Sequence, residues 1–300
     1  MLQSRFSTSL SALWRLAYAM RWLKEERLST LMHVYVINLA RSLDRRAHIT
    51  NECQRAGLDF EIVPAVDGRT LDLCDSTLID PSLESRWPFP AGTAGCVLSH
   101  FHIYQKILED GRDRALVLED DVILPADLSD LAEDVADHLT GAEVALFDYS
   151  CFPPGPLKMS LDGSIELPSS RLLALPIDAG QLANSGAYVI TRQACERMIE
   201  HLLPIRATAD GWQFYYEEGL LDRVRCVLPR PVPKNPSFES TIGLYSLGNG
   251  VKARLLGPLV RHKVPFLHQA IIYRRQRIMR NWDRAEVVDM PFIERPSRLG

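Results

Sequence analysis

The chain has 300 residues, of which 46% are hydrophobic and 24% are charged. This composition is ordinary for a globular protein, and the length allows one large domain or two small ones. It excludes a disulfide-dependent scaffold, because a chain of this size buries enough apolar surface without one. The six cysteines are scattered and include no Cys-X-X-Cys pair, so they predict reduced thiols rather than a zinc site or a disulfide framework.

The net charge of −4 is unevenly distributed. Residues 251–300 hold eleven Lys and Arg against four Asp and Glu, a net charge of +7, which leaves −11 for the first 250 residues. A basic tail rich in Arg and aliphatic residues predicts either peripheral contact with an anionic membrane or a solvated face. Nucleic acid is not an expected partner, because phosphates would repel the acidic body.

The first 30 residues contain one apolar stretch, Ser9 to Met20, which is too short to cross a membrane and carries Arg15. A signal peptide fits this interrupted stretch poorly. Apolar residues recur in it at helical spacing, so residues 1–30 are predicted to form an amphipathic extension. The expected location is the cytoplasm, with peripheral contact at the inner face of the cytoplasmic membrane through the basic tail.

Strand and helix patterns alternate over residues 31–235. His33–Leu39 predicts a strand, Arg41–Leu58 a helix, and Asp59–Gly68 a second strand, which together make a βαβ unit and imply a parallel sheet. The later expected elements are a helix (Thr93–Gly111, capped by Thr93), a strand (Arg114–Leu124), a helix (Asp127–Leu139), a strand (Glu143–Ser150), a loop or hairpin (151–170), a strand and helix (Ala183–Leu202), a helix (Asp210–Leu220) and a strand (Val224–Pro233).

This order of elements is typical of an α/β fold with a mostly parallel central sheet flanked by helices. We therefore expect one domain over residues 31–242, between the extension 1–30 and a basic C-terminal extension over 243–300. Loops such as 70–92 and 151–180 are expected to vary most and to shape any substrate pocket.

The stretch ALVLEDDVIL interrupts an apolar strand with three adjacent carboxylates, Glu119, Asp120 and Asp121. Side chains alternate along a strand, so Glu119 and Asp121 are predicted on one side and Asp120 on the other. Ligands of open α/β sheets bind beyond the carboxyl ends of strands. Clustered carboxylates need a positive partner, and Mg²⁺ or Mn²⁺ suits oxygen ligands and binds phosphates as well. The alternative is an acidic turn.

Six motifs follow one another in a recognisable order: VYVINLARSLDRR, AVDG, GCVLSH, ALVLEDDV, NSGAYVITRQAC and ADGW. In these motifs, over about residues 33–242, the chain resembles glycosyltransferase family 25, which includes bacterial lipooligosaccharide galactosyltransferases and is related to collagen galactosyltransferases. The resemblance implies a GT-A-like fold, a nucleotide-sugar donor, Mn²⁺ and inversion at the anomeric carbon. The expected function is a β-galactosyltransferase that moves galactose from UDP-galactose onto a glycan or glycolipid such as lipooligosaccharide.

On this resemblance the acidic triplet corresponds to the family's metal-binding motif. Asp121 is expected to bind the metal directly. Glu119 would bind it through water or would bind a ribose hydroxyl, and Asp120 would lie behind the metal or touch the sugar.

The other motifs imply contacts with the nucleotide. Asn38 and Arg41 follow the first strand and are expected at the nucleotide, and Asp67 is expected at the uridine or ribose, with an ordinary Asp-Gly turn as the alternative. Arg45 and Arg46 suit phosphate, unless they are surface arginines.

The GCVLSH motif places Ser99 and His100 next to each other in the predicted helix 93–111. Ser99 and His100 are expected near the donor, or else in helix packing; adjacent helical residues do not face one another, which excludes a nucleophilic pair.

Inversion requires a carboxylate that takes a proton from the acceptor hydroxyl. Asp210 is the candidate, and the neighbouring Trp212 could stack on a sugar. Asp210 could instead bind the metal or cap the following helix. A non-catalytic protein that binds a nucleotide or glycan is the alternative function. A metal-dependent phosphohydrolase is disfavoured, because only one acidic cluster is visible.

Overall fold

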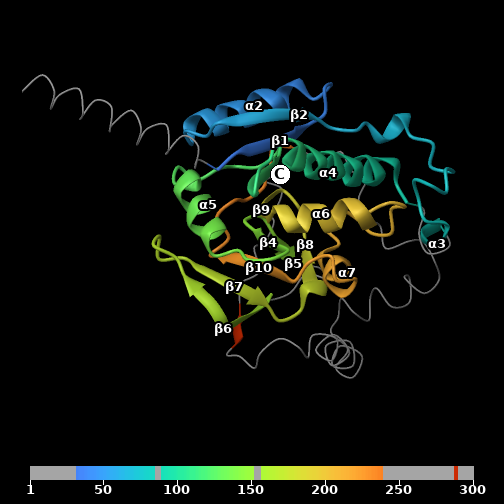
Figure 1. Ribbon diagram of the computed structural model, residues 1–300. Coiled ribbons are helices and arrows are strands. Elements are labelled where there is room, and N and C mark those ends of the chain that lie inside the picture. The colour runs from blue at the N-terminus through green and yellow to red at the C-terminus, as the bar shows by residue number, and fades with distance from the viewer. Residues whose placement is uncertain (1–31, 85–88, 152–156, 239–286, 290–300) are drawn as a thin grey trace, which may run out of the picture. The chain divides into compact units, whose positions relative to one another are not determined.

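The computed structural model describes residues 32–84, 89–151, 157–238 and 287–289 (Figure 1). Both predicted extensions, 1–30 and 243–300, lie outside the described residues except for 287–289. The helices are α2 (Leu43–Arg55), α3 (Pro81–Glu84), α4 (Ala91–Glu109), α5 (Leu128–Asp137), α6 (Arg192–His201) and α7 (Trp212–Glu217), with 3-10 turns η1 (Gly68–Thr70) and η2 (Ala179–Gln181). None of these helices is long and apolar enough to cross a membrane.

One mixed sheet forms the centre of the described structure, in the order β11-β6-β7-β10-β4-β9-β3-β1-β2. A small pair, β5 and β8, stands apart from it. The strands are β1 (Val34–Asn38), β2 (Phe60–Pro64), β3 (Arg114–Glu119), β4 (Glu143–Leu146), β5 (Ser150–Cys151), β6 (Lys158–Glu166), β7 (Leu172–Pro176), β8 (Leu182–Ala183), β9 (Ala187–Thr191), β10 (Arg223–Leu228) and β11 (Val287–Asp289).

The α/β fold with a central sheet flanked by helices is confirmed, but the sheet is not mostly parallel as predicted. Only β1–β2, β1–β3 and β4–β10 pair in parallel within the described residues, and the other neighbours in the sheet are antiparallel. The reason is that β9 lies antiparallel between β3 and β4, while β6 and β7 form a hairpin at one side. A strand pattern in sequence shows that a strand exists and leaves its direction open.

The pairings give β1, β2, β3, β4 and β10 the same direction. Their carboxyl ends therefore meet at one edge of the sheet, together with the amino end of the antiparallel β9. This edge is where open α/β sheets bind ligands. Every chain segment that follows one of these strands is thereby brought to the same place.

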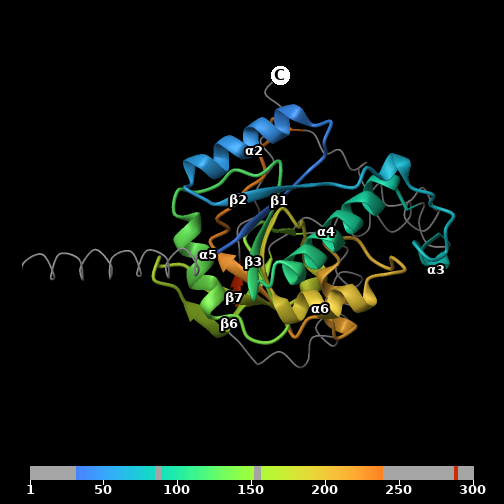
Figure 2. The ribbon, with the colours of Figure 1, turned by 45° about the horizontal axis from the view of Figure 1, so that its top comes forward.

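Both faces of the central strands are covered. α4 and α6 run side by side and contact β1, β3, β4 and β9 (Figures 1 and 2). Tyr35, Val117 and Tyr188 belong to the core beneath these helices. The intervening Val36 and Leu116 are fully buried as well, so the other face is also packed. Strands buried on both faces read as continuous apolar runs, which explains the ALVL sequence of β3.

Several predicted boundaries shift. β3 ends at Glu119 rather than continuing to Leu124, and α4 is preceded by Pro90 rather than capped by Thr93, whose side chain is buried. The expected loop or hairpin over 151–170 is a hairpin, β6–β7, which reaches further along the chain.

Candidate functional site

A cavity of about 200 Å³ opens at the carboxyl edge of the sheet. It contains most of the side chains predicted as a site: Arg41, Arg45, Asp67, Ser99, His100, Glu119, Asp120 and Asp121 line it, together with Cys96, Arg69 and Lys234. These residues come from the ends of β1, β2 and β3, from the face of α4 and from the segment after β10. Asn38 and Asp210 are not among its lining residues.

All three carboxylates of the acidic triplet line the cavity, which corrects the prediction that Asp120 faces away. Strand alternation ends with β3 at Glu119, and the following turn brings Asp120 and Asp121 to the same side. Asp120 and Asp121 are each only 7% exposed. The structure thus concentrates three like charges in a partly dehydrated space, which requires nearby positive charge.

Asn38 and Arg45 hold the acidic turn from the β1 side. Asn38 Nδ2 donates to Asp120 Oδ2 at 2.7 Å, so Asn38 supports the site from behind the cavity. Arg45 donates to Asp120 Oδ1 at 2.8 Å and to Asp121 Oδ2 at 3.2 Å. Arg45 therefore belongs to the site, while its neighbour Arg46 is exposed and is a surface arginine.

Lys234 is the principal cation that sequence reasoning missed. Its Nζ lies 2.9 Å from Glu119 Oε2 and 3.7 Å from Asp121 Oδ1. Backbone pairing brings it there, since Ile123 N donates to Pro233 O and Asn235 N donates to Asp121 O. Nothing in the Pro-rich sequence after β10 signals this return, because the pairing joins residues more than a hundred positions apart.

Glu119 and Asp121 have pKa values that are shifted in opposite directions. Burial favours the neutral form of Glu119, but the charge of Lys234 and contact with His100 outweigh it and hold the pKa of Glu119 below its usual value. Burial also raises the pKa of Asp121, and there the like charge of Glu119 acts in the same direction. Burial alone would lower the pKa of Lys234, but the surrounding carboxylates raise it. Lys234 is therefore an ammonium bound to carboxylates.

Asp121 fits a hard cation better than the other two carboxylates do. Its Oδ1 is buried and has no hydrogen-bond partner among the described residues. Both Asp120 oxygens accept hydrogen bonds, and Glu119 receives Ser185 Oγ at 2.8 Å as well as Lys234. A buried carboxylate oxygen that accepts no hydrogen bond from the described residues and lies 3.7 Å from the Lys234 ammonium is a suitable ligand for Mn²⁺ or Mg²⁺.

Asp148 is a second acidic residue that the sequence did not reveal. It follows β4, is completely buried, and pairs with Arg230 Nη1 at 3.3 Å. A Cβ on Gly186 would lie 2.4 Å from Asp148 Oδ2, so glycine in the NSGAYVIT motif makes room for this carboxylate. Burial raises the pKa of Asp148 to about 7; Lys234 and Arg230 oppose the rise, while Glu119 and Asp121 support it.

Asp148 should give the protein a pH-dependent stability. The folded pKa lies above the ordinary Asp value of 3.8, so between about pH 4 and pH 7 the folded state keeps a proton that the unfolded state releases. This contribution to the free energy of unfolding falls as pH rises through that window. Asp148→Asn cannot ionise, and urea unfolding at about pH 5 and pH 8 should show a smaller decline than in the native protein. Asp137→Asn, an exposed control, should preserve the native decline.

Asp67 is held by arginines at the mouth of the cavity. Its carboxylate accepts from Arg69 Nη2 at 2.6 Å and also contacts Arg41. These two arginines hold the pKa of Asp67 below its usual range. Asp67 Oδ1 also accepts from Arg69 N at the start of η1, so the turn role is confirmed and a nucleotide contact stays a prediction.

Ser99 and His100 both have structural roles within α4. Ser99 Oγ accepts from Val66 N at 2.9 Å and donates to Gly95 O at 2.6 Å, which ties the AVDG turn to the helix. His100 is 1% exposed, and its Nδ1 lies 2.7 Å from Tyr188 Oη. Both residues still line the cavity, so helix packing and a place beside the donor are compatible.

Asp210 does not cap α7, because Gly211 occupies the cap position. Asp210 Oδ2 instead accepts from Asn184 N at 3.0 Å. Since Ser185 bonds Glu119, the β8–β9 loop links Asp210 to the edge of the acidic site. Trp212 is fully buried against Tyr188, so it cannot stack on a sugar as predicted.

The fold and this site define an α/β protein with a charged binding cavity at the carboxyl ends of its central strands. Residues 32–152, which contribute most of the cavity, match the family model described as glycosyltransferase family 25 (LPS biosynthesis protein). The resemblance to glycosyltransferase family 25 is therefore confirmed.

Similar proteins support this match over a limited length. A glycosyltransferase 25 family member of Aedes aegypti is 38% identical over 99 residues, or 30% of this chain and 16% of that protein. Human procollagen galactosyltransferase 2 is 29% identical over 96 residues (30% and 15%), and mouse inactive glycosyltransferase 25 family member 3 is 34% identical over 96 residues (30% and 16%). The match thus spans about a sixth of the length of these relatives.

Among solved structures, a glycosyltransferase involved in glycosylation of the major capsid of PBCV-1 aligns with 65% of this chain and 81% of that chain. The TM-score is 0.34 and the sequence identity is 13%.

Proposed function

We propose that the protein is an inverting, metal-dependent glycosyltransferase that moves galactose from UDP-galactose onto a cell-surface glycan such as lipooligosaccharide. The observation that carries the proposal is the acidic triplet in the cavity, inside the segment that matches the family, with an Asp121 Oδ1 that accepts no hydrogen bond from the described residues. The choice of galactose is supported by the galactosyltransferase among the relatives. The choice of a lipooligosaccharide acceptor is supported by the description of the family as LPS biosynthesis proteins.

The charges of the cavity suit a nucleoside diphosphate. Asp121 Oδ1 would hold Mn²⁺ or Mg²⁺, with Glu119 beside it, and a bound metal supplies charge neutralisation for the diphosphate leaving group. Arg45 and Lys234 already border the cavity and offer N–H donors to phosphate oxygens. Arg41 and Arg69 add positive charge at the mouth, near the place predicted for the ribose and base.

Asp210 is the proposed general base. Asn184 N holds one of its carboxylate oxygens, which orients the group at the side of the β8–β9 loop. From there it would accept the proton of an acceptor hydroxyl as that hydroxyl attacks the anomeric carbon from the face opposite the leaving diphosphate.

The test is turnover of labelled nucleotide sugars by the full chain, with Mn²⁺ or with EDTA. We expect one donor, UDP-galactose, to be consumed with Mn²⁺ and to be spared with EDTA. Consumption of another donor alone would correct the sugar. Equal rates with EDTA would contradict the metal dependence.

A non-catalytic, ligand-binding role is the second candidate. It is favoured by the relative named as inactive and by Lys234, which already neutralises two of the carboxylates. Calorimetry with UDP separates the two candidates: binding together with turnover supports the enzyme, and binding without turnover of any donor supports the second candidate.

A further inference from the structure

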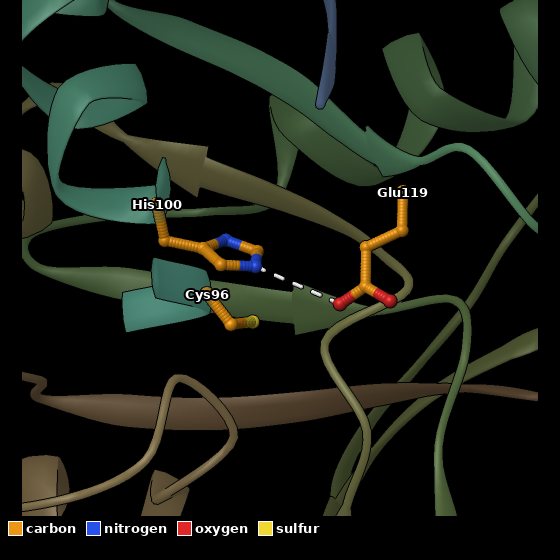
Figure 3. A group of neighbouring side chains, drawn as sticks. All are labelled: Cys96, His100 and Glu119. Carbon is orange, nitrogen blue, oxygen red and sulfur yellow. Dashed lines mark ion pairs between the residues drawn. The ribbon is translucent and has the colours of Figure 1, made fainter. Parts of the chain in front are cut away.

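Three side chains of different chemistry converge at one wall of the cavity (Figure 3). Cys96 and His100 are four residues apart on α4, so they project from the same face of the helix. Glu119 comes from the end of β3 and faces them. One ligand atom from each of the three lies within 4.8 Å of the others.

The imidazole of His100 is oriented as a metal-binding histidine would be. Its Nδ1 is 2.7 Å from Tyr188 Oη, which in turn lies 3.2 Å from Tyr104 Oη. Its Nε2 is buried, has no hydrogen-bond partner among the described residues, and points toward Glu119 Oε1 at 3.6 Å. Histidine ligands ordinarily use one ring nitrogen for the metal and fix the other through such an outer hydrogen bond.

From this geometry we propose that Cys96 Sγ, His100 Nε2 and Glu119 form a binding site for a thiophilic divalent cation. The expected ion is Zn²⁺. Sulfur, imidazole and carboxylate are the ligands that zinc prefers, and three protein ligands leave a fourth position open to the cavity. The thiolate and the carboxylate supply negative charge to the ion through Cys96 Sγ and the Glu119 oxygen that faces His100, while Lys234 keeps its contacts with Glu119 Oε2 and Asp121 Oδ1.

The site adjoins the position proposed for Mn²⁺ or Mg²⁺, with Glu119 between the two, but its ligand atoms differ chemically. Asp121 offers only oxygen, which suits hard cations, whereas a thiolate and an imidazole select Zn²⁺ and Co²⁺. The inference does not depend on the proposed transferase activity. Burial raises the pKa of the Cys96 thiol, so metal binding must release a proton and should weaken at low pH.

Co²⁺ titration of the untagged full chain, under reducing conditions, tests the site directly. One equivalent of Co²⁺ should produce the near-ultraviolet charge-transfer absorption of a cobalt thiolate, and Zn²⁺ should displace it. Cys96→Ser should abolish this absorption while the circular dichroism stays native. Cys74→Ser, which changes an exposed cysteine outside the cluster, should leave the absorption unchanged.

Two more variants separate the site from its surroundings. Tyr188→Phe removes the outer hydrogen bond to His100 and should weaken Zn²⁺ binding about 10–100-fold. Asp121→Asn should retain the cobalt–thiolate absorption, because Asp121 is not a ligand here. No thiolate absorption in the native chain, or an undiminished one in Cys96→Ser, would overturn the proposal, whatever the transferase assay shows.

Discussion

Asp121→Asn is expected to reduce kcat for sugar transfer by at least about 100-fold, because the substitution removes the carboxylate that would hold the metal and with it several kcal/mol of charge neutralisation at the leaving diphosphate. Stability should not fall. The pKa of Asp121 is raised, which means that its ionised form is disfavoured in the folded protein. A neutral amide of the same size relieves the repulsion by Glu119 and Asp120. Steady-state kinetics and urea unfolding on the same preparation measure both effects.

Asp137→Asn is the matched control, since it removes a carboxylate that is 80% exposed and pairs with Arg114 at the surface. It should leave both kcat and stability near the native values. If Asp121→Asn keeps native activity while EDTA still abolishes it, the metal is bound elsewhere in the chain. If Asp121→Asn unfolds at lower urea than the native protein, the electrostatic reading of the triplet is wrong.

Gly68→Ala is expected to destabilise the fold by about 3 kcal/mol or more and to disrupt the cavity with it. A Cβ at Gly68 would lie 1.7 Å from the carbonyl oxygen of Ala91, a backbone atom at the start of α4. A Cβ on Gly95, at the helix side of the same turn, would lie 2.6 Å from Val66 O. The backbone of the AVDG turn therefore packs directly against the backbone of α4. Neither backbone can move aside in the way that a flexible side chain can.

The comparison for Gly68→Ala is Gly57→Ala. Gly57 has nothing within 4 Å of the added Cβ, but its φ of +66° disfavours alanine, so a cost of about 1–2 kcal/mol is expected there. Urea unfolding ranks the two variants, and UDP binding by calorimetry reports on the cavity. Equal costs for the two variants, or native UDP affinity in Gly68→Ala, would show that the contact with Ala91 relaxes.

Most elements could be predicted from the sequence because their signals are local. The β-branched run of β1, the fully apolar run of β3 and the amphipathic pattern of α5 each record burial on particular faces. The boundaries of helices and strands were predicted less accurately. β3 stops at Glu119 because the segment after β10 pairs with the backbone of residues 121–123, a contact that no local pattern contains.

The residues of the candidate site likewise fall into those that have a local sequence signal and those that have none. Glu119, Asp120 and Asp121 can be recognised in the sequence, because three adjacent acids inside an apolar run require an explanation. The Cys96–His100 spacing was present in GCVLSH and could have been found by testing helical neighbours rather than Cys-X-X-Cys pairs. Asp148 and Ser185 gave no comparable signal, since their importance lies in contacts with residues from other strands.

The α/β class, the acidic triplet at a strand end and the resemblance to glycosyltransferase family 25 follow from the order of the amino acids, because periodicity and motifs are properties of neighbouring residues. The compensation of the charges depends instead on the folded arrangement of the strands. It reversed β9 within the sheet, buried Trp212 in the core, and placed Lys234 on two carboxylates of the triplet. The physical reason is that Coulombic pairing and burial depend on distance in space, and strand order sets that distance.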